Sequence, residues 1–481
     1  MNFNFADILR DTAQRHGERV ALVDGDRRLT WDELDQAVDR TAQGFAAAGL
    51  VPGYRVVLLV ANSIEFVTSY LGILRAGLVA VPLNTGLTKP EIAAVVQHSG
   101  ARLAVAGADL ADKIEGLRTV APDELEGHAP LLPQLDPEML AVLLYTSGTS
   151  GDPRAAMLTH RALAANVTNL SELGDDRMGP EDVVLGVLPM FHAFGLNAVL
   201  GWTVATGAAL IIDQRFDTAH TFDLIAKYGV TRLPLAPPAL HALLARPNLR
   251  EALQSVKVVL TGASALDRAL ADRFEQASGL FVHQGYGLTE ASPGVTTTLG
   301  EAEPKPGSVG RPLPNVEVRI ADEQGEDVEG DDPGEILIRG RNLFSGYWPD
   351  GADGPDLDGW YRTGDVGYLD SDGDLFLVDR LRELIIVSGF NVFPSEVEEV
   401  LVAAPGVREA AVIGVPSEET GEAVKAFVVP SPDATVDPAA VREYAGTRLA
   451  RFKCPVEIEV VDHLPHSVTG KVAKGRLRAD R

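Results

Sequence analysis

A short run of hydroxyl residues and glycines is the first feature of this 481-residue chain that could do chemistry. The run TSGTSG, residues 146–151, follows the apolar segment AVLLY and stands three residues before Arg154. Glycines let backbone N–H groups approach an anion closely, and hydroxyls add further donors. The run has neither the Lys-Ser/Thr pair of a Walker loop nor the spacing of the dinucleotide fingerprint. A phosphate-binding loop is therefore one interpretation, and a plain Ser/Gly linker is the other.

A second group of chemically capable residues lies in GYGLTE, residues 285–290. This group begins just after the strand-like LFVHQ, so it should lie at the carboxyl end of a strand, where α/β folds bind ligands. Further along, Lys471 in SVTGK lies within a basic tail. Charge pattern alone favours a solvated tail for that lysine, and an isolated Tyr or Glu is more often structural than functional.

Short β-branched runs alternate with helical stretches around these residues. From about Val56 the runs VVLLV, LVAVPL and RLAVAG are separated by helical segments, and the pattern returns between Pro180 and Gly287. This alternation is typical of βα units and a mostly parallel sheet. After Pro304, strands punctuated by Gly and Pro predict a smaller β-rich subdomain over about residues 304–380.

The last hundred residues have a different pattern, with one strand, a helix, two strands, a helix and a final strand. Such a segment predicts a compact α+β unit of its own. We place the boundary at DRLRE, residues 379–383. The predicted fold class is therefore α/β, with a large N-terminal domain over residues 1–380 and a small C-terminal domain over residues 381–481.

Composition limits the partners of the chain. The net charge of −26 argues against general affinity for nucleic acid or for an anionic membrane. The single cysteine, Cys454, excludes an internal disulfide, and we expect a buried small apolar residue rather than a catalytic thiol. The amphipathic first twenty residues are unlike a signal peptide, and no apolar run approaches the ~20 residues of a membrane span. We expect a cytoplasmic protein without integral membrane contact, and the sequence leaves a homodimer open.

The stretch YTSGTSGDPRAAMLTH, residues 145–160, resembles the signature loop of the adenylate-forming superfamily, which contains acyl-CoA synthetases, peptide-synthetase adenylation domains and beetle luciferases. Five more stretches resemble the family in its own order: LPMFHAFG (188–195), GYGLTE (285–290), YRTGDVG (361–367), DRLRELIIVSGFNVFPSEVEE (379–399) and LPHSVTGKVAKGRLR (464–478). Agreement at six ordered sites is not expected by chance. The resemblance therefore favours the phosphate loop over the linker.

The resemblance implies that the first loop holds the β- and γ-phosphates of ATP. The residues concerned are Thr146, Ser147, Gly148, Thr149 and Gly151. The family motif usually ends in Pro-Lys-Gly, whereas this chain has Pro153, Arg154 and Ala155. Arg154 keeps the positive charge and could bind phosphate with two hydrogen bonds. Ala155 lacks the freedom of glycine at positive φ, so the loop could be stiffer here.

The resemblance also implies a nucleotide site formed by distant segments. Tyr286, followed by Gly287, would pack on the adenine, Thr289 would contact the α-phosphate, and Glu290 would hold Mg²⁺, which needs carboxylate and phosphate oxygens. The adenine-side loop is matched less specifically, by Gly262, Ala263 and Ser264.

Two further residues would bind the ribose by the same resemblance. Asp365 would accept hydrogen bonds from the ribose hydroxyls, a task that suits an acceptor-only carboxylate; an Asp that caps a turn is the common alternative. Arg380 would contact ribose and phosphate close to the expected hinge residue, Arg382.

Catalysis is expected at Lys471, with Thr289, Glu290 and His192 as the other catalytic residues. A cation between the attacking carboxylate and the α-phosphate stabilises the negatively charged transition state of adenylyl transfer. By resemblance His192 lies at the carboxylate end of the acyl pocket; an isolated histidine on an apolar segment is otherwise more often a core residue. No paired histidine spacing or GxSxG elbow is present, so no catalytic metal besides Mg²⁺ and no serine hydrolase is predicted.

The expected reaction is ATP-dependent acyl-CoA synthesis from a fatty or aryl acid. The segments IIVSGFNVFPSEVEEVL and GVPSEETGEAVKAFVV resemble those of acyl-CoA synthetases, whose mobile C-terminal domain would bring Gly389 to the pantetheine tunnel of CoA. One alternative is an adenylating enzyme that passes a carboxylic acid, or a small inorganic acid such as nitrite, to an amine or carrier protein. Another is a catalytically silent scaffold or nucleotide sensor, which the retained catalytic residues disfavour.

Overall fold

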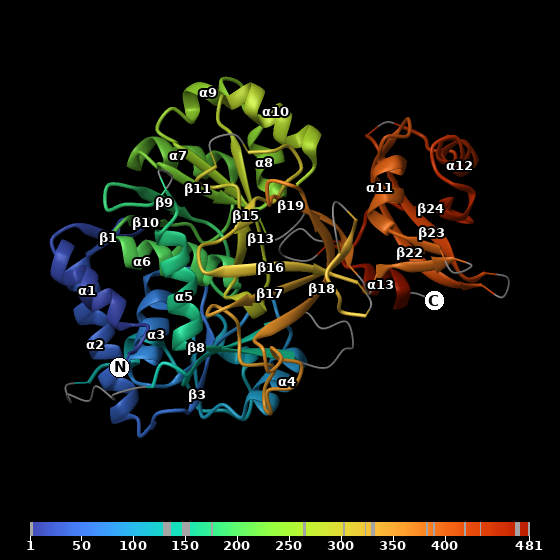
Figure 1. The fold of residues 1–481 in the computed structure, drawn as a ribbon. Coiled ribbons are helices and arrows are strands. Elements are labelled where there is room, and N and C mark those ends of the chain that lie inside the picture. The colour runs from blue at the N-terminus through green and yellow to red at the C-terminus, as the bar shows by residue number, and fades with distance from the viewer. Residues whose placement is uncertain are drawn as a thin grey trace. The chain divides into compact units, whose positions relative to one another are not determined.

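The computed structural model describes most of the chain as two compact units. The described residues are 3–127, 136–146, 154–174, 177–262, 266–301, 304–322, 324–328, 332–380, 383–387, 390–417, 420–432, 434–466 and 472–479. The larger unit comprises Met1–Glu317 and Ile338–Tyr361, and the smaller unit comprises Val318–Leu337 and Arg362–Arg481. Each unit has its own helices and sheets (Figure 1).

A six-stranded sheet in the larger unit supports the predicted phosphate loop. Its order is β6-β5-β3-β4-β7-β8, and its strands are β3 (Arg55–Leu59), β4 (Val79–Pro82), β5 (Leu103–Ala106), β6 (Thr119–Val120), β7 (Leu140–Thr146) and β8 (Arg154–Thr159). The strands pair in parallel except for the antiparallel β7–β8 pair. Strands β4 and β5 are buried over their whole length, as continuous apolar runs in parallel sheets usually are.

The predicted nucleotide-binding residues lie at the end of one strand of a nine-stranded sheet in the same unit. Its order is β15-β14-β13-β12-β11-β9-β10-β1-β2, and its strands are β1 (Val20–Asp24), β2 (Arg27–Thr30), β9 (Val183–Gly186), β10 (Ala209–Ile212), β11 (Arg232–Leu235), β12 (Val258–Thr261), β13 (Val282–Gly287), β14 (Gly294–Thr297) and β15 (Arg311–Pro312). The strands from β1 to β13 in this order run parallel. Three pairs at the edges are antiparallel: β1 with β2, β13 with β14, and β14 with β15.

Helices of the larger unit pack on these sheets. They are α1 (Asp7–His16), α2 (Trp31–Ala47), α3 (Ile64–Arg75), α4 (Lys89–Ser99), α5 (His160–Ser171), α6 (Trp202–Thr206), α7 (Thr218–Tyr228), α8 (Pro237–Leu243), α9 (Leu249–Ala252) and α10 (Arg268–Ser278). Helices α7 to α10 form one group near β11 and β13 (Figure 1). A π-helix, Phe194–Gly201, leads directly into α6. Thr30 and Glu33 form a capping box at α2, which satisfies N–H groups of its first turn.

His160 is a completely buried titratable residue at the start of α5. Its Nδ1 accepts a hydrogen bond from the Phe5 backbone N–H, with 3.1 Å between the nitrogens. Its Nε2 has no hydrogen-bond partner among the residues that the structure describes. Burial lowers the pKa of His160 to about 4, so the ring is neutral in the folded unit at neutral pH.

We expect acid to destabilise the larger unit through His160. Because its folded pKa lies below the ordinary ~6.5, the unfolded chain takes up the proton first, and stability is lost as the pH falls from about 6.5 towards about 4. The loss between about pH 7.5 and about pH 5.5 is about 1 kcal/mol from this group. Urea unfolding can be followed by the fluorescence of the four tryptophans, all of which lie in the larger unit. His160→Asn keeps an acceptor but cannot titrate, and an unchanged pH slope in that variant would contradict this expectation.

The smaller unit contains two further sheets. Most of the four-stranded sheet β16-β17-β18-β19 belongs to it, with β16 (Val316–Ala321), β17 (Gly334–Gly340), β18 (Trp360–Leu369) and β19 (Leu375–Arg380). The other sheet has the order β21-β20-β23-β22, with β24 paired to β23, and comprises β20 (Ile385–Val387), β21 (Phe390–Val392), β22 (Val407–Ser417), β23 (Gly421–Pro430) and β24 (Glu457–Val460). The helices are α11 (Pro394–Val402), α12 (Pro438–Gly446) and α13 (Lys474–Ala479).

The predicted α/β class is confirmed, as are the strands expected between Pro180 and Gly287, which are β9 to β13. The boundary proposed at residue 380 stays a prediction; the compact units divide after Glu317, Leu337 and Tyr361. The expectation of a buried Cys454 is wrong, because its side chain is only partly covered by the core of the smaller unit. No described helix is both long and apolar enough to cross a membrane.

Candidate active site

The β7–β8 hairpin positions both ends of the predicted phosphate loop. Thr146 is the last residue of β7 and Arg154 the first of β8, and the two are paired across the strands. The remaining predicted loop residues, Ser147, Gly148, Thr149 and Gly151, lie outside the described residues. The pairing therefore brings the two ends of the predicted loop together.

Arg154 has two contacts that the sequence did not predict. Its guanidinium forms an ion pair with Asp353, with 2.5 Å between Nη2 and Oδ2. The guanidinium carbon also lies 3.8 Å from the centre of the Tyr347 ring. Arginine suits this arrangement, because its planar cation can stack on an aromatic ring while donating hydrogen bonds. Phosphate binding by Arg154 stays a prediction.

Glu290 is connected to the same tyrosine. It lies with Thr289 in a 3-10 turn, Thr289–Ala291, just beyond β13. The Tyr347 hydroxyl donates a hydrogen bond to Glu290 Oε1, and the Phe344 N–H donates to the Glu290 backbone carbonyl at 2.8 Å. Burial, and next the charge of Glu290, raise the pKa of Tyr347 well above its ordinary value. The hydroxyl therefore stays protonated and acts as a donor.

Tyr286 and Gly287 end β13 beside this turn. Tyr286 is buried and is paired with Thr296 of β14. At Gly287 an added Cβ would lie 2.3 Å from the Pro293 carbonyl oxygen, so a larger residue would force the backbone apart. The four predicted residues therefore lie within one short stretch at the carboxyl end of β13, as the sequence pattern predicts: Tyr286, Gly287, Thr289 and Glu290.

Gly262, the first residue of the predicted adenine-side loop, lies close to the segment that contains the predicted acyl-site residue His192. An added Cβ at Gly262 would lie 3.2 Å from the Gly285 carbonyl oxygen and 3.4 Å from the Phe194 ring. His192 lies two residues before Phe194, at the start of the π-helix, and its Nδ1 accepts a hydrogen bond from the Phe194 N–H at 3.4 Å. Ala263 and Ser264 lie outside the described residues. The segment with His192 is therefore adjacent to β12 and β13 in the larger unit.

The smaller unit contains the predicted ribose residues. Asp365 in β18 is buried and is paired with Arg380 of β19. The Asp365 N–H donates a hydrogen bond to Thr363 Oγ1 at 3.0 Å. The structure describes the backbone of Arg380 but not its side chain, and it does not describe Arg382, Gly389 or Lys471. The roles predicted for these residues stay predictions.

The donor set at Glu290 fits a magnesium ion. A carboxylate is a hard oxygen ligand, and Mg²⁺ in nucleotide enzymes typically takes one or two carboxylates together with phosphate oxygens. The bond from Tyr347 occupies one lone pair of Oε1, and a carboxylate offers about four lone-pair sites in all. Glu290 can therefore be held by Tyr347 and still bind a cation.

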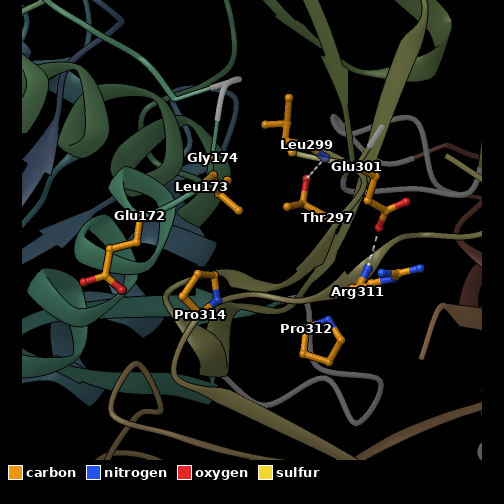
Figure 2. A pocket seen from close by; sticks show the side chains of 10 residues that line it. Glu172, Leu173, Gly174, Thr297, Leu299, Glu301, Arg311, Pro312 and Pro314 are labelled. Carbon is orange, nitrogen blue, oxygen red and sulfur yellow. Dashed lines mark hydrogen bonds between the residues drawn. The ribbon is translucent and has the colours of Figure 1, made fainter. Parts of the chain in front are cut away.

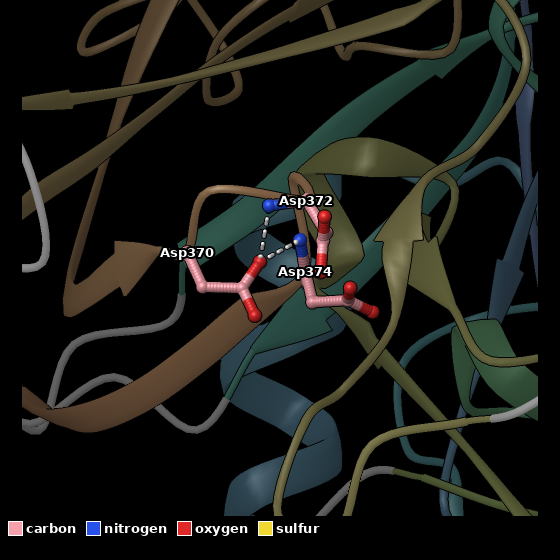
Figure 3. A group of neighbouring side chains, drawn as sticks. All are labelled: Asp370, Asp372 and Asp374. Atoms are coloured by element: carbon pink, nitrogen blue, oxygen red, sulfur yellow. Dashed lines mark hydrogen bonds between the residues drawn. The ribbon is translucent and has the colours of Figure 1, made fainter.

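Three other carboxylates lie close together in the β18–β19 turn, where the Asp370, Asp372 and Asp374 ligand atoms are all within 4.8 Å of one another (Figure 3). Asp370 Oδ1 accepts hydrogen bonds from the Asp372 and Asp374 N–H groups, both at 3.0 Å. Asp side chains commonly stabilise turns in this way. The turn itself therefore accounts for this acidic group.

A cleft of about 610 Å³ opens between β14, β15 and the end of α5. Glu172 and Gly174 line one side and Thr297, Glu301 and Arg311 the other (Figure 2). The Arg311 N–H donates to Glu301 Oε1 at 3.0 Å. None of the predicted site residues is among the described residues that line this cleft, so it is separate from the site above.

The residues that sequence reasoning missed are Tyr347 and Asp353. They lie in SGYWPDGAD, 57 or more positions after Glu290, and nothing in that composition distinguishes them from an ordinary turn. The bond to Glu290 becomes visible only in the fold.

Comparisons with known proteins show the family of the chain. Residues 9–348 match the family model described as AMP-binding enzyme, and residues 396–471 match the model described as AMP-binding enzyme C-terminal domain. The chain is 35% identical to 4-coumarate–CoA ligase 5 of Oryza sativa subsp. japonica, covering 96% of this chain and 92% of that protein. It is 32% identical to the long-chain-fatty-acid–CoA ligase of Bacillus subtilis (strain 168), covering 99% and 94%.

The fold of the chain is also similar to that of a solved structure. The crystal structure of ATP-bound MatB from Rhodopseudomonas palustris matches with a TM-score of 0.94 at 32% identity, covering 100% of this chain and 99% of that one. The family models together extend over most of the chain. The chain therefore belongs to the AMP-binding enzyme family, within which it is an acid–thiol ligase of the adenylate-forming acyl- and aryl-CoA ligase group.

Proposed function

We propose that the enzyme uses MgATP to join a carboxylic acid to CoA in two half-reactions. The observation that supports this most is the chain of contacts from Arg154 through Tyr347 to Glu290. It links the end of the phosphate loop to the carboxylate that would hold the metal. A site that binds the phosphates of ATP and its metal together is what an adenylating enzyme needs.

In the first half-reaction a substrate carboxylate oxygen attacks the α-phosphorus of ATP, and the bond to the β-phosphate breaks. Hydroxyl and N–H groups of the loop that begins at Thr146 stabilise the departing pyrophosphate. Thr289 and Lys471 stabilise charge at the α-phosphorus. Magnesium, when bound, neutralises phosphate charge, and Glu290 is its proposed protein ligand.

In the second half-reaction the CoA sulfur attacks the acyl carbonyl carbon of the adenylate, and the bond to AMP breaks. Asp365 and Arg380 would hold the ribose and phosphate of the leaving AMP. Gly389, which has no side chain, would leave room for the pantetheine arm.

The acid is proposed to be fatty or aryl, because the chain is similar to ligases named for acids of both kinds. A cavity of about 20 Å³ lies between the π-helix, α6 and strands β9, β11 and β12, and Trp202 and Arg232 line it. Such a volume holds about one water molecule. The Arg232 guanidinium is fixed by Asp182, with 3.0 Å between Nε and Oδ2. None of the predicted site residues is among the described residues that line this cavity, so it is separate from the predicted site.

The test is a pyrophosphate-release screen with purified enzyme, MgATP and fatty, aryl, dicarboxylic and amino acids, run with and without CoA. We expect CoA-dependent AMP formation with at least one fatty or aryl acid. Pyrophosphate release without a thioester for any acid would instead indicate transfer to an amine or carrier protein. No release with any acid would contradict the adenylation proposal itself.

A further inference from the structure

Tyr347 stands between the two charged residues of the site. Its hydroxyl donates to Glu290 Oε1, and its ring lies under the Arg154 guanidinium at 3.8 Å. Tyr347 is itself buried. It therefore contacts both the end of the phosphate loop and the proposed metal ligand without being placed to react with substrate itself.

We infer that Tyr347 is a positioning residue that fixes the Glu290 carboxylate for magnesium, and that Arg154 holds the Tyr347 ring in place. The inference rests on the proposed role of Glu290 as a metal ligand. It assigns Arg154 a task besides charge, because only a planar cation can both stack on the ring and remain paired with Asp353 at 2.5 Å.

The need for such a residue follows from the chemistry of magnesium. Mg²⁺ demands near-ideal octahedral geometry, so a ligand that rotates among several orientations binds it poorly. A glutamate side chain has three rotatable bonds, and a hydrogen bond to one carboxylate oxygen restricts them. Residues that hydrogen-bond a metal ligand typically change metal affinity or activity by about 10- to 100-fold when they are mutated.

The backbone around Tyr347 is rigidly tied to β8. The Tyr347 N–H donates to the Ala352 carbonyl at 2.9 Å, and the Trp348 N–H donates to the Ala155 carbonyl at 2.9 Å. Tyr347 also forms a β-bridge with Ala156. The same strand that begins with Arg154 thus supports the tyrosine, so the hydroxyl has a fixed point from which to orient Glu290.

The Phe344 ring completes the support. It meets the Tyr347 ring edge to face, with 5.1 Å between centroids, while its own N–H binds the Glu290 backbone carbonyl. Backbone and side chain of Glu290 are consequently held by residues only three positions apart. This double attachment distinguishes Glu290 from an exposed surface carboxylate.

The experiment measures the coupling between magnesium and nucleotide rather than turnover. The dissociation constant of adenosine 5′-(α,β-methylene)triphosphate is determined by calorimetry in EDTA and in saturating Mg²⁺. The readout is the dissociation constant in EDTA divided by the dissociation constant in Mg²⁺. Tyr347→Phe keeps the ring and removes only the hydroxyl. We expect it to reduce this ratio about tenfold, with little change in the value measured in EDTA. Arg154→Lys keeps the charge and is expected to reduce the ratio to a smaller extent.

Tyr228→Phe is the matched control, because it removes a hydroxyl that donates to the Gly25 carbonyl at 3.2 Å in the same unit. Its ratio should equal that of the wild type. The inference is overturned if Tyr347→Phe keeps the wild-type ratio, or if it weakens binding equally in EDTA and Mg²⁺, which would indicate a purely structural role. If Tyr347→Phe does not fold, a wild-type ratio in a folded Arg154→Lys variant would overturn it.

Glu290→Gln separates this inference from the proposed function. If Glu290→Gln abolishes the coupling and Tyr347→Phe leaves it intact, only the positioning role fails. If Glu290→Gln also leaves the coupling intact, the metal assignment fails with it. The double variant should show no loss beyond that of Glu290→Gln alone, because Tyr347 acts through that carboxylate.

Discussion

Lys471→Ala is expected to lower the rate of acyl-adenylate formation by about 100- to 1,000-fold, the usual effect of removing one transition-state donor or cation. The reason is that negative charge accumulates around the α-phosphorus when the carboxylate attacks. Thioester formation from a preformed acyl-adenylate should change much less, because no phosphorus centre is attacked in that step. The prediction rests on the family resemblance, since Lys471 lies outside the described residues.

The described residues on either side of the Lys471 segment are paired with each other. His466 and Val472 form an antiparallel β-bridge, and the Ala473 N–H donates to the Pro465 carbonyl at 2.7 Å. Pyrophosphate exchange measures the first half-reaction, and purified acyl-adenylate with CoA measures the second. Lys453→Ala is the control, because Lys453 lies on another segment of the same unit. Equal losses in both half-reactions of Lys471→Ala would refute a role confined to adenylation.

Lys474→Met is expected to destabilise the smaller unit by about 2 to 4 kcal/mol, because it breaks a mostly buried ion cluster. Lys474 Nζ lies 2.8 Å from Glu383 Oε2 and 2.8 Å from Glu398 Oε1. The lysine side chain is only 11% exposed. Burial lowers the pKa of Lys474, but the two carboxylates outweigh burial and raise it. Methionine fills a similar volume and leaves both carboxylates without this cation.

The pH dependence of that loss has a definite sign. Burial raises the pKa of Glu398, and Lys474 is the main opposing influence. Without the lysine the pKa of Glu398 rises further. A carboxyl group whose folded pKa exceeds its unfolded value loses its stabilising effect as the pH rises through the folded pKa. The penalty of Lys474→Met should therefore be larger at neutral pH than in mild acid.

Hydrogen–deuterium exchange of α11 and α13 amides measures this penalty, since the smaller unit contains no tryptophan. Lys453→Met is the matched control, because Lys453 also pairs with α11, at 2.6 Å from Glu396, but both side chains are more exposed, at 22% and 42%. Its loss should stay within about 1 kcal/mol. A Lys474→Met penalty as small as this, or one independent of pH, would disprove the buried cluster as a stabilising element.

The layered sheets could be predicted because their strands have local signatures. VVLLV and the VVL of KVVLTG are short, mostly β-branched apolar runs typical of buried strands, and they lie in β3 and β12. Strand β1 was not predicted, although Leu22 is completely buried. It pairs with β10, where Leu22 lies opposite Leu210. The local sequence pattern around Leu22 does not indicate a partner strand so distant in the chain.

The candidate site was predictable to the extent that its residues are consecutive. Thr289 and Glu290 follow a strand within one motif, so their shared location at its carboxyl end could be inferred. Tyr347 could not be found in this way, because its hydrogen bond to Glu290 depends on how residues 344–353 return to the edge of β8. Arg154 was expected to face phosphate alone, and its stacking on Tyr347 needed the same long-range geometry.

The π-helix between His192 and Trp202 makes the number of residues in this segment consequential. A π-turn contains one residue more than an α-turn, and successive residues of an α-helix are rotated by about 100°. Deleting one residue from Phe194–Gly201 would let α-helical turns form. The side chains within the shortened turn would then point in different directions, because the extra residue of a π-turn is accommodated within that turn. Among related chains, a difference of one residue in this helix would therefore point a different set of side chains at the cavity beside Trp202 without any substitution in the cavity wall.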